Sequence, residues 1–179
     1  MIAETMQKSL EQEPQFAVTA NLAPQLHDRG TFIPEKIEVT LCLADLEAES
    51  DAIKRGESLD TDTLVKAGRR YPLATVVNLM HESAAVLLQR AKKDNGTGVI
   101  ALEPVEVTLP NIAGLQDFSA ALFTRIQVYE QYQLRDYESE ITLPLRCTEM
   151  TPLQPGDQYQ AQLQLGSYPR VCVSRVEDN

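Results

Sequence analysis

The side chains that could do acid–base or nucleophilic chemistry are few and scattered in this 179-residue sequence. The two histidines are His27, beside Asp28, and His81, beside Glu82, and neither has a helical partner four residues away that could share a metal ion. Cys42 could be a reactive thiol, although a cysteine packed under a covering element is more common. The motifs G-x-S-x-G, Walker P-loop and G-x-G-x-x-G are all missing from the sequence. We therefore predict no catalytic residue, no cofactor and no metal site, and a protein that is not an enzyme.

An enzyme of unknown class is the alternative to this prediction. It would require His27, His81, Cys42 and some of the many carboxylates to converge in space. Carboxylate pairs such as Asp60 and Asp62 carry little information in so acidic a chain, because their geometry depends on the fold.

A different kind of site is indicated by the polar residues of the last half of the chain. No lysine occurs from residue 94 onward, and nine glutamines do. Protein-docking surfaces are depleted in lysine and enriched in tyrosine and arginine, and an amide can donate and accept across a contact without burying a charge. We predict a protein interface made of Arg125, Gln127, Tyr129, Gln131, Gln133, Gln158, Gln160, Gln162 and Gln164. Two alternatives are a solvated strand face filled by glutamine through compositional drift, and a platform for carbohydrate or nucleobases.

The elements that must position these residues are strands, because apolar and polar residues alternate along three runs between Arg125 and Leu165. A period of two places alternate side chains on opposite faces of a sheet. The runs are 125–134, 140–147 and 158–165. Similar patterns predict strands at 16–22, at 36–43 with Ile37 and Val39 on the apolar side, and at 171–176. Residues 99–109 predict one strand, or two short ones broken at Pro104.

Apolar residues at helical spacing predict one long amphipathic helix over Leu73–Lys93, ended by Asn95-Gly96. Shorter helices are predicted from Asp45 to about Arg55, with Gly56 as the stop, and over Gln116–Phe123. The predicted fold class is α+β: a mainly antiparallel sheet of about 6–7 strands with the long helix packed on one face. A partly closed barrel is the alternative. Residues 1–14 are predicted to form an N-terminal arm and residues 15–179 a single domain.

The charge and the cysteine content limit the classes of partner and the cellular compartment that we expect. The net charge of −10 argues against direct binding to nucleic acid or to an anionic membrane surface. No apolar run approaches the roughly 20 residues that span a bilayer. Three cysteines without a C-x-x-C pair favour a reducing compartment. We therefore expect a cytoplasmic protein, or part of a particle assembled in the cytoplasm, whose partners are other protein subunits, either further copies of itself or different chains.

The leading functional hypothesis is a structural or assembly subunit of a homo- or hetero-oligomeric complex, such as a ring, a connector or a virion component. The second is an acidic binding or regulatory adaptor, in which the acidic segment Asp45–Asp62 engages a basic protein partner. On that second hypothesis, neutralising Asp45, Glu47, Glu49 and Asp51 should abolish binding and leave the fold intact.

Overall fold

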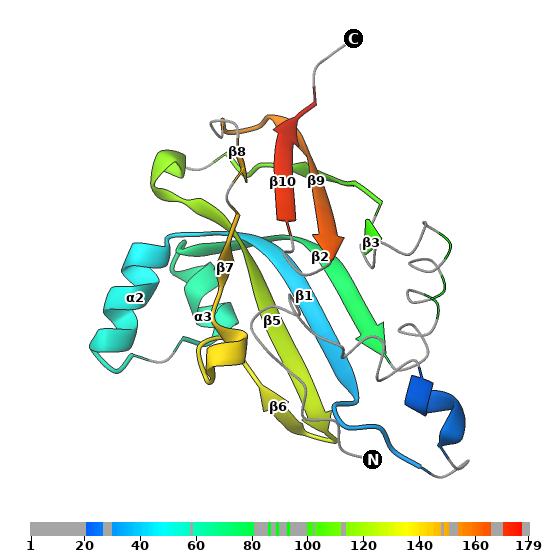
Figure 1. Cartoon of the computed structure of the whole chain (residues 1–179). Coiled ribbons are helices and arrows are strands. Elements are labelled where there is room, and N and C mark those ends of the chain that lie inside the picture. Colours follow the sequence, from blue (N-terminus) through cyan, green and yellow to red (C-terminus); the bar gives the residue numbers. More distant parts are fainter. Residues whose placement is uncertain are drawn as a thin grey trace.

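The computed structural model describes residues 21–26, 30–57, 59–80, 86, 89, 93, 100–101, 103–111, 114–147, 149–150, 154–165 and 170–176. Within these residues the strands form two five-stranded sheets, and helices are short (Figure 1). The prediction of a β-rich, mainly antiparallel fold is therefore confirmed. The predicted single sheet of about 6–7 strands is not matched, because the described strands separate into two sheets, and these strands form no closed barrel.

The first sheet contains β1 (Lys36–Ala44), β2 (Arg70–Met80), β5 (Ser119–Tyr129), β6 (Tyr132–Leu134) and β7 (Leu145–Arg146). Its order is β2-β1-β5-β6, with β7 also paired to β5, and all pairs are antiparallel. β1 matches its prediction: Ile37, Val39, Leu41 and Leu43 are all buried on one face. Pro72 lies in β2 beside a register shift, which suits an edge strand because proline cannot donate to a ladder.

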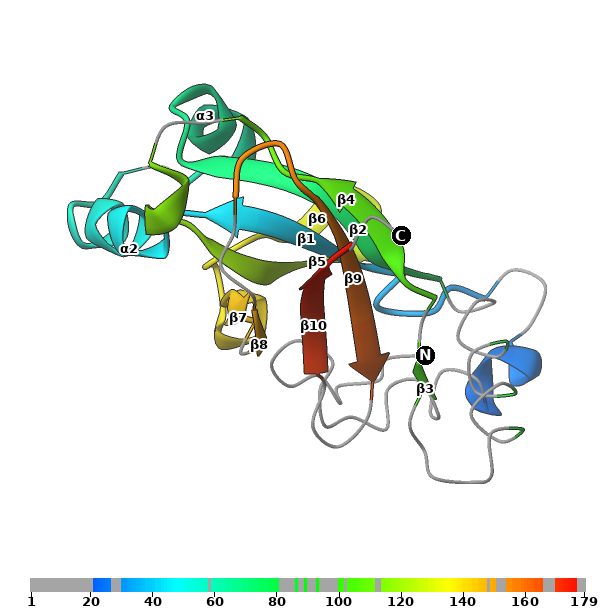
Figure 2. The ribbon, with the colours of Figure 1, turned by 90° about the horizontal axis from the view of Figure 1, so that it is seen from above.

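The second sheet contains β3 (Ile100–Ala101), β4 (Val105–Thr108), β8 (Glu149–Met150), β9 (Gln158–Leu165) and β10 (Arg170–Arg175). Its order is β3-β9-β10-β8, with β4 paired to β9, and β8 runs parallel to β10. Seen from above, β9 and β10 run across the direction of β1 and β5 (Figure 2). The strands predicted at 158–165 and near 171–176, and the two short strands around Pro104, are confirmed.

The main core lies between the two sheets. It joins Leu41 and Leu122 of the first sheet to Val107, Tyr159 and Val173 of the second. A smaller cluster on the opposite face of the first sheet contains Cys42, Ala44, Ala121 and Phe123, packed against Leu46 and Tyr137. One end of the first sheet is therefore covered on both faces.

Two short helices lie at that covered end (Figure 1). α2 (Leu46–Lys54) is capped by Asp45, whose side chain accepts from the Ala48 N–H, and α3 (Thr61–Lys66) is capped by Asp60, whose side chain accepts from the Thr63 N–H. Gly56 follows α2 with φ 72°, as its predicted stop requires. The structure also contains three 3₁₀ turns, Ala23–Gln25 (η2), Leu115–Asp117 (η3) and Glu140–Thr142 (η4).

The predicted long helix is wrong in its first third. Residues 73–80 belong to β2, where Thr75, Val76 and Val77 suit a strand because β-branched side chains lose rotamer freedom in a helix. Two register shifts against β1 break the alternation that marks a half-buried strand, so that Leu73, Ala74 and Val76 all pack on the main core. Of the remainder, only Val86, Gln89 and Lys93 are described, and these three are helical.

Three predictions of shorter elements also differ from the structure. The helix predicted over 116–123 is only a single 3₁₀ turn, and β5 begins at Ser119. The run 125–134 is a hairpin of two strands and not one strand, because Glu130 turns the chain with φ 51°. The run 140–147 begins as a 3₁₀ turn and contributes only the two-residue β7. The predicted arm 1–14 and residues 16–20 of the first predicted strand lie outside the described residues. The strand prediction is wrong at its end, because Asn21 and Leu22 are helical. No helix in the described part of the chain is long and apolar enough to cross a membrane.

Candidate functional site

A network of buried charges lies under α2, at the covered end of the first sheet. Arg70 and Glu49 are 1% and 0% exposed, and the guanidinium donates to both carboxylate oxygens, from Nε to Oε1 at 2.9 Å and from Nη2 to Oε2 at 2.8 Å. Its Nη1 also bonds Oδ2 of Asp136, which is 6% exposed. One guanidinium thus serves two carboxylates, and this bidentate geometry is the kind that makes a buried ion pair tolerable.

Local structure explains how these three side chains meet. Glu49 lies three residues after Leu46 and three before Ala52, on the face of α2 that packs inward. Arg70 opens β2 directly after α3, and the Asp45 N–H donates to the carbonyl of Arg69, which ties the two segments together. Asp136 belongs to the turn that follows β6.

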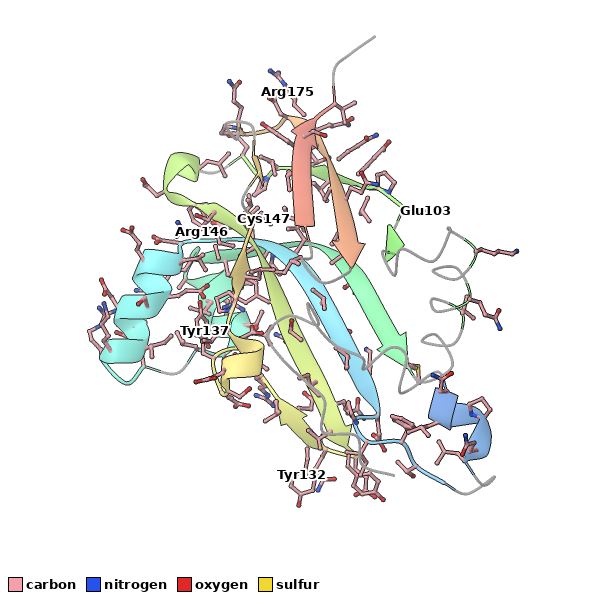
Figure 3. All side chains as sticks on the ribbon, in the orientation of Figure 1. Glu103, Tyr132, Tyr137, Arg146, Cys147 and Arg175 are labelled. Carbon is pink, nitrogen blue, oxygen red and sulfur yellow. The ribbon has the colours of Figure 1, made fainter. Side chains whose placement is uncertain are left out.

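Two aromatic rings complete the network. The Arg70 guanidinium lies 3.7 Å from the centroid of the Phe123 ring, and Tyr137 packs edge-on against Phe123 with centroids 6.4 Å apart. The Tyr137 hydroxyl donates to Oε2 of Glu49. Tyr137 has φ 66°, a strained conformation for a bulky residue, which these contacts hold in place. Figure 3 shows Tyr137 beside β7, on the side of the molecule where α2 and α3 lie.

The network shifts the pKa of three of its members or neighbours. Burial and the bond to Glu49 raise the pKa of Tyr137. Burial alone would lower the pKa of Arg70, but the bonds and charges of Glu49 and Asp136 raise it instead. Burial raises the pKa of the Cys42 thiol from 9.0 to about 12, against a smaller lowering by Arg70. Cys42 is therefore held as a neutral, packed thiol, which favours the structural interpretation over a reactive nucleophile.

The network reaches the surface through Thr61 and Arg125. The Thr61 hydroxyl donates to Oδ2 of Asp136 at 3.4 Å, and Nη2 of Arg125 donates to the same hydroxyl. Oδ1 of Asp136 is buried and has no hydrogen-bond partner among the described residues. Such an atom calls for an explanation, because buried acceptors are normally satisfied.

Three cavities follow this face of the first sheet. A cavity of about 310 Å³, here called the acidic cavity, is lined by the carboxylates of Glu57, Asp60, Asp136 and Glu138. Ile53, Leu59, Tyr137 and Arg135 also line it. A second cavity, of about 210 Å³, shares Asp60, Arg135 and Asp136 with it and adds Arg125 and Gln133. A third, of about 120 Å³, lies between β1, β5 and β6 beside Gln127.

Five of the predicted interface residues lie on the β5–β6 hairpin next to these cavities. Arg125, Gln131 and Gln133 are exposed and Gln127 is half-buried. Tyr129 is 39% exposed, and the neighbouring Tyr132, which the prediction did not include, is 64% exposed. Figure 3 shows Tyr132 at the hairpin end of the molecule, pointing away from the ribbon.

The hairpin turn is held by Glu35, a residue that no sequence pattern singles out. Its Oε2 accepts from the Glu130 N–H at 3.0 Å and from Nε2 of Gln127 at 2.9 Å. The same Gln127 Nε2 donates to the Glu130 carbonyl at 3.1 Å. Gln127 therefore acts partly as an internal brace and is not wholly available to a partner.

The other four predicted interface residues lie elsewhere. Gln158, Gln160, Gln162 and Gln164 are all in β9, which belongs to the second sheet. Gln158 and Gln160 are exposed and Gln162 is half-buried. The single continuous sheet face that the prediction required is thus divided between two sheets.

The acidic segment Asp45–Asp62 is less free than its sequence indicates. Glu49 is buried in the network, so it is not part of a solvated surface and cannot be neutralised without affecting the fold. Asp45 and Asp60 cap helices, while Asp51 pairs with Lys54 at 2.9 Å and Glu57 with Arg55 at 2.6 Å.

The other residues considered for catalysis or metal binding are the two histidines and the acidic side chains. His27 and His81 lie outside the described residues. Where the structure is described, no three histidine, cysteine or acidic side chains are grouped so as to hold a metal ion. No protein-family model matches the sequence, and a search of curated proteins finds no match either.

Proposed function

We propose that this chain is a non-enzymatic structural or assembly subunit that docks on another protein chain through its β5–β6 hairpin. The observation that carries the proposal is a pair of exposed tyrosines, Tyr129 and Tyr132, on a turn that Glu35 holds in one conformation. Tyrosine supplies large contact area with few rotatable bonds and is enriched in interface hot spots.

The bracing of the turn supports docking on energetic grounds. Association loses free energy when loops and side chains must become ordered, and a turn already fixed by three hydrogen bonds avoids part of that cost. Gln131 and Gln133, exposed beside the tyrosines, are uncharged, whereas Glu130 at the turn is exposed and charged. Covering the two glutamines does not require desolvating an ion.

The adaptor hypothesis has less support, because most of its acidic side chains are capping helices or paired with cations of the same chain. The assembly proposal includes self-association and association with a different subunit, as in a ring, a connector or a virion component. It also includes the cytoplasmic setting expected from the cysteine content.

Size-exclusion chromatography with light scattering at micromolar concentration tests self-association. We expect the wild-type chain to elute as more than one copy and the double variant Tyr129→Ser/Tyr132→Ser to lose affinity by more than about 30-fold, the range of hot-spot residues. Val65→Ser, which removes an exposed apolar side chain on α3, is the matched control and should change nothing.

A second assay covers association with a different chain. Tagged protein is recovered from its native cells, and stoichiometric partners are compared between wild type and the tyrosine variant. The proposal fails if the wild-type chain is strictly monomeric and the tyrosine variant retains the same partners in the same amounts.

A further inference from the structure

Among the described residues, the buried network holds two carboxylates and one cation bonded directly to them. Arg70 is shared by Glu49 and Asp136, and Arg125 bonds the Thr61 hydroxyl, which in turn donates to Asp136. Oδ1 of Asp136 has no hydrogen-bond partner among the residues described. An unpaired carboxylate oxygen that is shielded from water is costly, so a donor at this position would be strongly favoured.

Asp136 also forms part of the wall of the acidic cavity. Asp60 and Glu138 line the same cavity, and Oδ2 of Asp60 carries the capping bonds of α3. Glu138 uses Oε2 to accept from the Arg135 N–H. Each of these carboxylates therefore has an oxygen that none of these bonds uses, and Arg135 is the one cation in the lining.

The rest of the lining suits an aliphatic chain. Ile53, Leu59 and Tyr137 give the cavity an apolar part, and Ile53 is 40% exposed. A volume of about 310 Å³ is at the lower end of the range of small-ligand sites, and it is ample for one long side chain. A lysine combines an apolar stem with a compact charged head that has three donors.

We propose that the acidic cavity is a subsite for an alkylammonium group, namely the side chain of a lysine on the protein that docks against the hairpin. The ammonium lies against Asp136, with Asp60 and Glu138 elsewhere in the same lining, and the methylene stem lies along Ile53 and Leu59. The identity of the lysine's source depends on the proposed function, whereas the affinity of the cavity for the group does not.

The test titrates the ¹⁵N-labelled chain with Nα-acetyl-lysine amide and follows the backbone amide signals of Gly56, Tyr137 and Glu138. We expect saturable shifts with a Kd in the millimolar range, roughly the affinity of one side chain alone. The Nε-acetylated form of the same compound has the same stem without the charge, and it should not bind. Added salt should weaken the lysine shifts.

Two capping aspartates provide a matched pair of variants. Asp60→Asn removes a charge from the cavity, while Asp45→Asn removes one from the cap of α2, outside the lining. Asparagine caps a helix as well as aspartate does, so both variants should fold. We expect Asp60→Asn to weaken binding by about tenfold and Asp45→Asn to leave it unchanged. Glu138→Gln, which retains an acceptor for the Arg135 N–H, is a second cavity variant with the same expected loss.

The inference is overturned if the two lysine compounds bind equally, if no shift appears, or if Asp45→Asn weakens binding as much as the cavity variants do. Its failure is separable from that of the proposed function. Loss of tyrosine-dependent association with lysine binding intact rejects only the assembly proposal, and the reverse result rejects only the lysine subsite.

Discussion

Replacing Arg70 by methionine should be among the most destabilising single changes available to this protein. Methionine fills much of the same space without charge, and the change leaves Glu49, Asp136 and the Tyr137 hydroxyl in a buried site with no cation. Removing one partner of a buried ion pair costs about 3–5 kcal/mol. For a chain of this size each kcal/mol lowers Tm by roughly 2–4 °C, so we expect a fall of about 6–20 °C.

Urea unfolding followed by circular dichroism measures the change, with the slope m compared between variants to confirm that the unfolded states are alike. Lys54→Met is the matched control, because Lys54 makes an ion pair with Asp51 whose side chains are 71% and 59% exposed. We expect no measurable change for it, since exposed pairs are screened by solvent.

A compensated variant separates charge imbalance from simple loss of packing. Arg70→Met/Glu49→Met/Asp136→Asn removes all three charges together, and buried ion networks replaced by apolar groups are often as stable as the original. We expect this triple variant to recover most of the stability lost by Arg70→Met. The reasoning is refuted if Arg70→Met costs less than about 1 kcal/mol, or if the triple variant is no more stable than the single one.

Two further predictions concern pH and the core. Folding raises the pKa of Cys42 from 9.0 to about 12, so the neutral thiol contributes its full stabilisation below pH 9 and loses it between pH 9 and 12. The unfolding free energy should therefore fall between pH 8 and pH 10 by about 1 kcal/mol less in Cys42→Ala than in wild type. An equal fall in the two proteins would contradict the assignment. Leu122 is 1% exposed in the main core, and Leu122→Ala should lower the free energy of unfolding by about 2–5 kcal/mol in the same urea assay. Tyr132→Ala, at the exposed hairpin, should lower it little. A decrease for Leu122→Ala no larger than that for Tyr132→Ala would contradict the placement of the core.

The sequence predicts the parts of the fold in which one side of an element meets solvent. β1 and β9 alternate clearly, and α2 has a cap and a glycine stop. The same reasoning fails in β2, where register shifts interrupt the alternation, and at the start of β5, where Ala121 and Leu122 are buried on opposite faces of one strand. Where both faces are covered, a strand reads as a continuous apolar run, and such a run cannot be told from a helix by periodicity alone.

The buried network could not be predicted from the sequence at all. Glu49 and Asp136 lie 21 and 66 residues from Arg70, and each resembles an ordinary surface charge in its local sequence. Only the tertiary fold places them under one helix. The hairpin residues were found because their composition is unusual, but composition could not show that a turn divides the run or that the β9 glutamines belong to another sheet.

The acidic cavity and the polar side of the hairpin lie on one face of the first sheet, whereas Tyr132, two residues from Leu134 in β6, lies on the face of the main core. On that face Cys42 and Phe123 are covered by α2 and the turn at Tyr137, while Arg125 and Gln133, farther along β5 and β6, are exposed. The second cavity joins the two halves, since Arg125, Gln133 and Asp136 all line it. A partner lying on the open half would therefore extend the layer that α2 begins, and a side chain at its edge would reach the acidic cavity. The buried network holds only the cavity side of that surface, because Glu49 bonds Tyr137 and Arg70 bonds Asp136. The hairpin turn is held separately by Glu35, so the two halves can be perturbed one at a time.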